Sequence, residues 1–434
     1  PSSDGATVTA STMLTCEEVL VMERGRVAQR VLDLVATESV TGNERAAIDL
    51  VASWLGPVAD EVDAWVTPMS DLETDPAYPG REVERAEVPV VAARLVGERP
   101  GPTIVLTGHV DTVPVGDGGR WTRDPAGEIE GDTLYGRGAA DMKAGMVAAV
   151  EAFTSIADRG RDFPGEIRLV AVPGEEDGGT GTLAAIRRGW TGDLVIITEP
   201  TSGPNGPQIV VAHGGALTFT IEVDGRSAHA ATRLDGESAL EHFWTVHRAL
   251  RHIEQELNSA EMNPAMAALD LPYPTAIGIV RGGVWASNVM EQMAAELRVG
   301  VTIDETITEA EGRFERSLRD AITGDPWLDE HPPSIERTGA AFGSSSIDPS
   351  HSLVRAVSDA ADAVTGVAAA TIGVPYGCDM ALWTRVGGAA TLVYGPGDVH
   401  HAHAVDERVS LNEIGVVAET LVETVRRLHD MTEV

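Results

Sequence analysis

The sequence predicts an α/β protein with a mostly parallel sheet, into which a smaller ferredoxin-like α+β unit is inserted. Short apolar runs typical of buried strands alternate with helical stretches in the first half of the chain, and this pattern returns near the end. These runs cover residues 103–107, 167–172, 194–198 and 390–394. Between residues 214 and 340 the predicted order is strand, helix, strand, strand, helix, strand, which is the order of a ferredoxin-like unit.

The remaining elements follow from the spacing of apolar residues. Helical spacing predicts helices over residues 16–37, 44–55, 143–158 and 410–429. A strand is predicted over residues 88–96, whereas residues 66–88 contain three prolines and are predicted to be irregular. In the insert, the predicted strands cover residues 217–223, 275–280, 291–303 and 334–337, and the predicted helices cover 236–258 and 305–322.

Length and charge indicate two domains and restrict the partners. The chain has 434 residues, beyond the ~250–300 at which a single core stops growing. We therefore expect one domain from residues 1–213 and 341–434 and a second from residues 214–340. Lys+Arg total 32 against Asp+Glu 67, a formal net charge of -35, which disfavours nucleic acid and anionic membrane surfaces as partners. A small molecule is the expected substrate.

Cysteine usage and targeting patterns predict a soluble, cytoplasmic protein. The two cysteines, Cys16 and Cys378, lie far apart and have no metal-binding or redox spacing, so a reducing compartment is the simplest assignment. Charged residues interrupt the apolar stretch that a signal peptide would need. No run approaches the ~20 apolar residues of a membrane-spanning helix.

Histidines and carboxylates follow the ends of the predicted strands. His109 and Asp111 follow the first run, Glu175 and Glu176 follow the second, and Glu199 directly follows the third. Because the carboxyl ends of parallel strands meet at one edge of a sheet, these side chains are expected to lie close together. A ligand set of nitrogen and oxygen without sulfur suits a pair of divalent metals such as zinc.

Two further residues near this set have a physical role of their own. Asp111 lies two residues past His109 in extended chain, so both side chains emerge on one face. An ionised aspartate there can hold the imidazole N–H and raise the basicity of the ring. Lys143 is the only lysine of the chain and stands near Asp141, which indicates a need for an ammonium group at this place.

Seven motifs occur in an order that resembles one enzyme family over nearly the whole chain. They lie at residues 39–44, 108–114, 136–145, 174–176, 198–201, 225–229 and 395–407. The family is that of the co-catalytic metallohydrolases, which includes acetylornithine deacetylase, succinyl-diaminopimelate desuccinylase, aminoacylase-1 and carboxypeptidase G. The resemblance implies a catalytic domain with an inserted lid and dimerisation domain, and a homodimer as the assembly.

The resemblance also implies the metal ligands. Asp141 would bridge two divalent metals, of which one also takes His109 and Glu199, and the other takes Glu176 and His403. Two cations ~3.5–4 Å apart need a shared anion between them, and a carboxylate with two oxygens supplies it. Zinc is the expected metal, with cobalt or manganese as alternatives, because the same ligands accept all three.

The catalytic roles implied by the resemblance fall on Glu175 and His229, with Asp111 as the support of His109. Alternation along the chain sends Glu175 to the side opposite Glu176, toward a water whose pKa metal coordination lowers to ~7. Its carboxylate would take the proton of that water and return it to the leaving amine. His229, in the insert, would stabilise the oxyanion, from the neighbouring subunit or after closure of the insert over the site.

Substrate contacts are expected from four further residues. Asn288 matches a family asparagine near the substrate, and Asp379 matches a position that faces the pocket. Arg281 and Arg298 are candidates for binding a substrate carboxylate. Four residues in or near the insert depart from the family pattern and leave the substrate open: Gly214, Thr302, Arg233 and Ser238.

The function that these expectations favour is hydrolysis of the amide bond of an N-acyl amino acid or a similar small amide, by a deacetylase-like or desuccinylase-like enzyme. One alternative is a dipeptidase, a carboxypeptidase or another C–N hydrolase on the same scaffold, including one that acts on an aromatic amine. A second alternative is a metal-free, inactive relative that serves as a binding protein.

Overall fold

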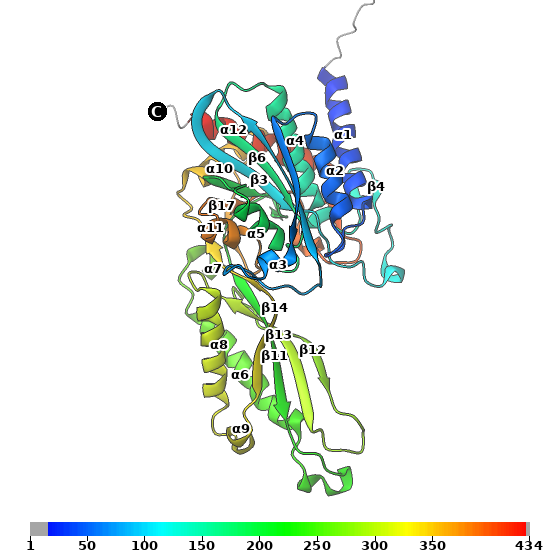
Figure 1. Cartoon of the computed structure of the whole chain (residues 1–434), viewed down its shortest axis with the longest axis vertical. Coiled ribbons are helices and arrows are strands. Elements are labelled where there is room, and N and C mark those ends of the chain that lie inside the picture. Colours follow the sequence, from blue (N-terminus) through cyan, green and yellow to red (C-terminus); the bar gives the residue numbers. More distant parts are fainter. Residues whose placement is uncertain (1–15, 431–434) are drawn as a thin grey trace, which may run out of the picture.

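The computed structural model describes residues 16–430, which form two lobes of unequal size (Figure 1). The larger lobe combines the two ends of the chain, and the smaller lobe, green to yellow in Figure 1, is built from the middle. The fold is therefore the predicted α/β protein with an inserted unit. None of the helices in the described part of the chain is long and apolar enough to cross a membrane.

A nine-stranded sheet forms the centre of the larger lobe. Eight strands follow one another in the order β1-β2-β6-β3-β7-β17-β10-β15, and β16 pairs with β10. The central strands β6, β3, β7 and β17 are parallel, whereas β1 and β2 on one side and β15 on the other are antiparallel to their neighbours. The strands are β1 (Glu61–Pro68), β2 (Glu87–Val96), β3 (Arg99–His109), β6 (Pro164–Val172), β7 (Leu194–Ile197), β10 (Ile209–His213), β15 (Ser345–Ser346), β16 (Thr371–Val374) and β17 (Ala390–Val393).

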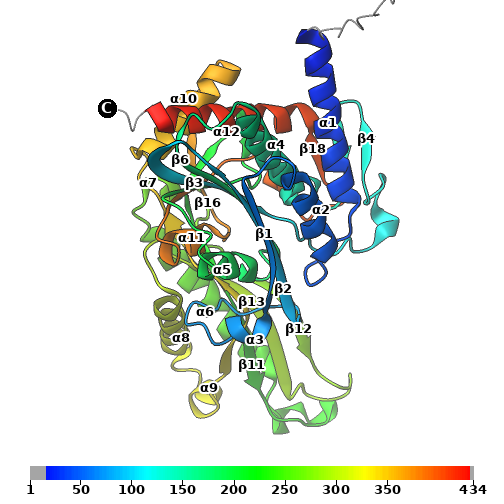
Figure 2. The ribbon, with the colours of Figure 1, turned by 45° about the horizontal axis from the view of Figure 1, so that its top comes forward.

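Helices cover both faces of this sheet (Figures 1 and 2). One group is joined by contacts of α4 with α1, α2 and α12, and of α12 with α10. A second group consists of α5, α3 and α11. Because both faces are covered, the carboxyl-terminal halves of β3 and β6 are buried and mostly apolar. The helices are α1 (Cys16–Ala36), α2 (Arg45–Leu55), α3 (Met69–Leu72), α4 (Ala144–Asp158), α5 (Thr180–Arg187), α10 (Ser352–Thr365), α11 (Met380–Arg385) and α12 (Leu411–Asp430).

Short strands complete the larger lobe, as β4 (Glu128–Glu130), β5 (Thr133–Tyr135) and β18 (Arg408–Ser410) form a small sheet and β8 (Ser202–Gly203) pairs with β9 (Gly206–Pro207). The region predicted to be irregular, residues 66–88, contains the end of β1 and the short helix α3 instead. The sequence pattern missed β1 because its residues are half-exposed and mixed, and its pairing with β2 stabilises it.

The smaller lobe has the predicted ferredoxin-like order. Its four-stranded antiparallel sheet has the order β12-β13-β11-β14 and packs its inner face on α6 and α8. Alternate residues of β11, from Leu217 to Val223, are buried in a core that is separate from that of the larger lobe. The elements are β11 (Gly215–Asp224), α6 (Ala239–Ser259), β12 (Ala276–Gly282), β13 (Gln292–Val301), α8 (Ile307–Ile322), α9 (Pro326–Glu330) and β14 (Ser334–Phe342). The short helix α7 (Pro264–Ala267), which follows α6 in the chain, contacts β10 and β16 of the larger lobe.

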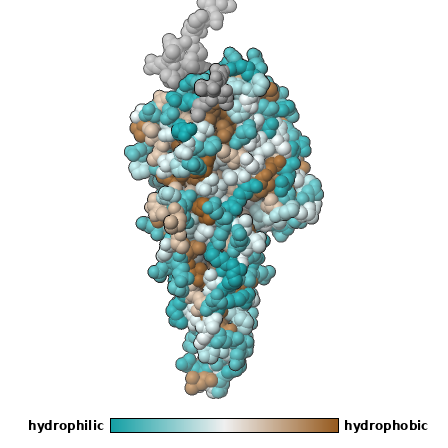
Figure 3. Space-filling view, turned by 90° about the vertical axis from the view of Figure 1, so that its left-hand side faces the viewer, coloured by the Kyte–Doolittle hydropathy of each residue, from teal (hydrophilic) through white to brown (hydrophobic). Residues whose placement is uncertain are grey.

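The surface reflects the acidic, polar composition of the chain. On the face drawn in Figure 3, hydrophilic residues prevail, and apolar residues form separate patches that extend from the larger lobe into the narrower one. The outline tapers toward the end of the smaller lobe, so the molecule is elongated.

Candidate metal centre

The strand ends bring the predicted ligands to one edge of the large sheet. His109 is the last residue of β3, which lies between the parallel strands β6 and β7. Glu175 and Glu176 follow β6, and Glu199 follows β7. Gly108, beside His109, leaves room for the side chain of Met142, because a Cβ there would lie 2.3 Å from Cε of Met142.

Carboxylate oxygens surround the Nε2 atom of His109. Oδ1 of Asp141 lies 3.1 Å from it, Oε1 of Glu199 lies at 3.3 Å, and Oε2 of Glu175 lies at 3.9 Å. Nδ1 of the same ring lies 3.0 Å from the backbone oxygen of Asp111. Since a carbonyl oxygen only accepts, Nδ1 carries the proton and Nε2 is left free as a ligand atom.

Asp141 stands between two histidines. Its Oδ1 faces His109, whereas its Oδ2 lies 3.5 Å from Nε2 of His403. His403 also lies 3.0 Å from Oε1 of Glu176 and has a left-handed backbone, with φ of 57°. One carboxylate thus presents one oxygen to each of two sites, which is the arrangement of a bridging ligand.

Two residues to which the sequence assigned no role hold Asp141 in place. Glu407 is buried and accepts hydrogen bonds of 3.0 Å from the backbone N–H groups of Ala140 and Asp141. Arg137 donates to the other oxygen of Glu407 at 2.6 Å. Glu407 lies in the last of the seven motifs, but nothing in that motif shows that it binds a backbone more than 260 positions away.

Burial and mutual repulsion disfavour ionisation of the clustered carboxyl groups. Burial, with the charges of Asp141 and Glu176, raises the pKa of Glu199 to about 8. Burial and the neighbouring acids also raise the pKa of Glu175 well above its ordinary value, and that of Glu176 to a smaller extent. A divalent cation among these oxygens would offset both effects, so the residues present fit a metal centre.

The ligand atoms are also close enough together for such a centre. Those of His109, Asp141 and Glu176 lie within 4.8 Å of one another, and so do those of His109, Glu175 and Glu199. The ring of His109 is buried, which alone would lower its pKa, but the carboxylates of Glu199, Asp111 and Asp141 raise it well above the ordinary value. Negative charge therefore dominates this pocket.

Asp111 connects His109 to the loop of the two glutamates. Its Oδ1 lies 3.3 Å from Nδ1 of His109. Its two oxygens accept hydrogen bonds from the backbone N–H groups of Glu175, at 3.3 Å, and Glu176, at 3.1 Å. The sequence predicted the contact with the imidazole, whereas the contacts with the loop appear only in the structure.

Lys143 and Asp379 are buried next to the cluster. The ammonium of Lys143 donates to the backbone oxygen of Thr37 at 2.9 Å, and burial lowers its pKa to about 8. Asp379 accepts a hydrogen bond of 2.5 Å from the Thr182 hydroxyl, and burial raises its pKa to about 6. The charge of Asp379 is one of the causes that raise the pKa of Glu175.

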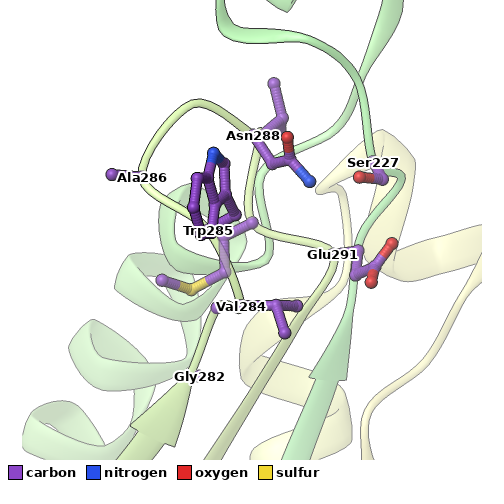
Figure 4. Close-up of a pocket in the computed structure, with 10 residues that line it drawn as sticks. Ser227, Gly282, Val284, Trp285, Ala286, Asn288 and Glu291 are labelled. Carbon is purple, nitrogen blue, oxygen red and sulfur yellow. The ribbon is translucent and has the colours of Figure 1, made fainter.

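The other predicted residues lie in the smaller lobe. His229 and Asn288 are exposed and form an isolated β-bridge with each other. Asn288 and Trp285 line a cavity of about 360 Å³, with Ser227 and Glu291 across from them (Figure 4). The turn between β11 and α6 that carries His229 is at the far end of this lobe, away from the large sheet (Figures 1 and 2).

The two arginines proposed for a substrate carboxylate contact residues of their own lobe in this conformation. Arg281 is exposed and forms an ion pair with Glu296 on the neighbouring strand. The guanidinium of Arg298 lies over the ring of Phe342, 5.3 Å from its centroid. The structure therefore brings together the predicted ligands and Glu175, with Asp111 and Asp379 beside them, but not His229, Asn288 or these arginines.

A parallel sheet with histidine and carboxylate side chains at its carboxyl edge, and an inserted second lobe, defines a metal-dependent hydrolase. Residues 105–427 match the family described as Peptidase family M20/M25/M40. The chain belongs to this family and is an enzyme that acts on C–N bonds.

Curated relatives and solved structures agree with this assignment. The chain is 27% identical over 387 residues to N-formyl-4-amino-5-aminomethyl-2-methylpyrimidine deformylase of Bacillus subtilis, with 84% of each chain covered. It is 28% identical over 402 residues to acetylornithine deacetylase of Shigella sonnei, covering 90% of this chain and 95% of that one. An M20 family metallo-carboxypeptidase from Sulfolobus solfataricus has the same fold, with a TM-score of 0.72, 15% identity, and 93% and 99% of the two chains covered.

Proposed function

We propose that the protein hydrolyses the amide bond of an N-acyl amino acid or a similar small amide. The observation that carries this proposal is Asp141, whose two oxygens face two histidines within a cluster of buried carboxylates. Relatives named as a deformylase and a deacetylase support an acyl group of small size. A small-molecule substrate also suits the net charge of -35, which disfavours nucleic acid.

Two divalent metals are proposed as cofactors, with His109, Asp141 and Glu199 holding one and Asp141, Glu176 and His403 holding the other. Zinc is the proposed metal, and cobalt or manganese would fit the same donors. When bound, the metals supply Lewis acidity that lowers the pKa of a water and polarises the substrate carbonyl.

Glu175 is the proposed general base. Its carboxylate lies beside His109, at 3.9 Å, and its pKa is raised well above the ordinary value, by burial first and then by neighbouring acids. A carboxylate of raised basicity takes a proton from the attacking water at its oxygen and then gives that proton to the leaving amine nitrogen. Asp111 positions Glu175 relative to the proposed ligand His109, because it contacts the backbone of Glu175 and the ring of His109.

The smaller lobe is proposed as a lid and dimerisation domain, residues 214–340, on a catalytic domain of residues 1–213 and 341–434. The two separate hydrophobic cores support this division. His229 would stabilise the oxyanion and Asn288 would contact the substrate, with Asp379, Arg281 and Arg298 as further substrate contacts.

A homodimer in the cytoplasm is the proposed assembly and location. Cys378, a buried free thiol, suits a reducing compartment.

A substrate panel tests the function directly. Purified full-length protein is assayed with N-formyl, N-acetyl and N-succinyl amino acids, dipeptides and aromatic amides, each with added zinc, cobalt or manganese. Turnover is expected for an N-acyl amino acid and is expected to disappear with a chelator and to return with metal. Turnover of dipeptides or aromatic amides alone would favour the alternative hydrolases. Metal-free protein without turnover on any substrate would favour an inactive binding relative.

A further inference from the structure

A buried arginine lies under the loop that carries Glu175 and Glu176. Arg85 precedes β2, and only 1% of its side chain is exposed. It forms ion pairs with Glu44, 3.0 Å between Nη1 and Oε1, and with Asp177, 3.1 Å between Nη2 and Oδ1. Both partners are also buried. Burying charged groups costs free energy that the ion pairs only partly offset, so stability alone is a weak reason for such a cluster.

The guanidinium supports the backbone of that loop. Gly174, which directly precedes Glu175, has a φ of +69°, and a Cβ at this position would lie 2.7 Å from Nη1 of Arg85. The guanidinium therefore occupies the space that a side chain at position 174 would need. Asp177, at the other end of the loop, also accepts a hydrogen bond of 3.3 Å from the backbone N–H of Val83. Val83 and Arg85 thus bind Asp177 at one end of the four-residue loop, and Arg85 packs against Gly174 at the other end.

The same loop is bound from its other side by Asp111. The carboxylate oxygens of Asp111 accept hydrogen bonds from the backbone N–H groups of Glu175 and Glu176. Oδ1 of Asp111 also lies 3.3 Å from Nδ1 of His109. The loop that carries the two glutamates is therefore bound by Arg85 and Asp177 on one side and by the support of His109 on the other.

We propose that Arg85 is a positioning residue that sets the placement of Glu175 and Glu176 relative to His109. It acts through its ion pair with Asp177 and through its packing against Gly174. It belongs neither to the proposed metal ligands nor to the proposed substrate contacts. The effect on turnover rests on the proposed function, whereas the effect on metal affinity does not.

The test compares Arg85→Met, which removes the charge, with Arg85→Lys, which keeps a charge but loses the planar fork that reaches two carboxylates. Zinc affinity of the full-length chain is measured by calorimetric titration, and kcat and KM are measured on the best substrate of the panel. Arg85→Met is expected to weaken zinc binding and to lower kcat, each by about 10–100-fold, with KM changed by less than about twofold. Arg85→Lys is expected to lie between the wild type and Arg85→Met.

Arg30→Met is the matched control. Arg30 pairs with the buried carboxylate of Glu151 at 2.8 Å and connects α1 to α4, away from the proposed ligands. This control is expected to lower the melting temperature while leaving zinc affinity and kcat unchanged. A double-mutant cycle of Arg85→Lys with Asp177→Asn is expected to be non-additive in kcat, because both changes act on the same loop.

Zinc affinity and kcat within about twofold of the wild type in Arg85→Met would overturn the proposal. If Arg85→Met does not fold, the same readouts on Arg85→Lys and Asp177→Asn decide, and wild-type values in both would overturn it. A wild-type protein that binds zinc but cleaves none of the panel would refute the proposed function, and the zinc affinities of the variants would still decide the role of Arg85.

Discussion

At the scale of single residues, the candidate metal centre depends on different roles for two neighbouring glutamates: Glu175 as the proposed base and Glu176 as a proposed ligand. Glu176 faces His403 at 3.0 Å, whereas Glu175 faces His109 at 3.9 Å and has Asp379 as a charged neighbour. Both are acidic, adjacent and buried, so their composition does not distinguish them. Their directions do. Strand alternation predicts opposite directions from the sequence, but the two residues lie in a turn that the hydrogen bond from the N–H of Gly178 to the backbone oxygen of Glu175, 2.9 Å long, closes.

Glu175→Gln is expected to keep both metals and to lose activity. The amide is nearly the same size as the carboxylate but does not take a proton, so kcat is expected to fall by at least ~10²-fold. Glu176→Gln is the control and is expected to lose both activity and metal. Metal content by elemental analysis and initial rates measure the two effects. Metal loss in Glu175→Gln with retention in Glu176→Gln would show that the two roles are exchanged.

His213 gives the folded state a dependence on pH. This residue ends β10, is fully buried, and lies 3.1 Å from the backbone oxygen of Gly214 through its Nδ1. Burial lowers the pKa of His213 to about 4, whereas the unfolded chain binds the proton near pH ~6.5. Between these values the unfolded state binds more protons, so this residue makes stability fall as the pH drops from ~6.5 toward 4.

His213→Asn is expected to remove that part of the pH dependence. The free energy of unfolding of the variant, relative to the wild type, is expected to rise by ~2 kcal/mol between pH 7.5 and pH 5. Urea unfolding of both proteins at the two pH values measures this difference. His252→Asn, at an exposed position on α6, serves as the control and is expected to show no such change. A constant difference between wild type and His213→Asn would contradict the assignment.

At the scale of elements, the centre requires that the start of α4 lies directly against the end of β7. A Cβ on Gly145, in the first turn of α4, would lie 1.7 Å from the backbone oxygen of Thr198, the residue before Glu199. The helix that follows Asp141 and the strand that precedes Glu199 therefore touch through backbone atoms. This contact sets the spacing between two of the proposed ligands.

Gly145→Ala is expected to push these elements apart. The clash is with backbone, so the protein is expected to lose about 1–3 kcal/mol of stability and part of its metal affinity. Gly415→Ala is the control, because a Cβ on Gly415, within α12, would meet no atom within 4 Å, and alanine there is expected to stabilise by about 0.5–1 kcal/mol. Thermal unfolding and zinc titration of both variants check this. Unchanged zinc affinity in a destabilised Gly145→Ala would contradict the role of this contact.

At the scale of the whole molecule, the turn that carries His229 lies at the end of the smaller lobe that is far from the large sheet (Figure 1). The edge strand β12 offers a surface for a second copy, since within residues 16–430 it pairs with β13 alone and exposes Ile279 (41%) and Val280 (54%). An open, apolar edge strand is a site at which another chain adds to a sheet. Both features favour a dimer in which one subunit supplies His229 to the centre of the other.

Mixed dimers distinguish this arrangement from closure of the lid within one chain. His229→Ala and Glu175→Gln are each expected to be inactive. If His229 acts on the partner's centre, random mixing of the two variants gives about half mixed dimers with one intact centre each, hence about a quarter of wild-type activity. If His229 acts within its own chain, the mixture stays inactive. The measurement is the activity of the two variants after co-expression and purification. In a separate light-scattering experiment, Val280→Lys is expected to shift the protein to monomer.

The sequence by itself determined the chemistry and the order of the fold. Runs of apolar residues fix strands locally, and His109, Glu175, Glu176 and Glu199 come within four residues after such runs, at or just past the strand ends. The helical periodicity also predicted α4, α6, α8 and α12 to within a few residues. These features depend on neighbours in sequence, which is why a single chain without its structure sufficed for them.

Only the tertiary structure decided which residues support the ligands. Arg85 meets Asp177 across 92 positions, and Glu407 meets the backbone of Asp141 across 266. Such contacts arise when the sheet brings distant loops to one edge, and local spacing contains no record of them. The half-exposed strand β1 was missed for the same reason, since its hydrogen bonds with β2, and not its own residues, stabilise it. The proposed metal ligands can thus be recognised from their neighbours in sequence, whereas the residues that hold those ligands in place are set by the tertiary fold.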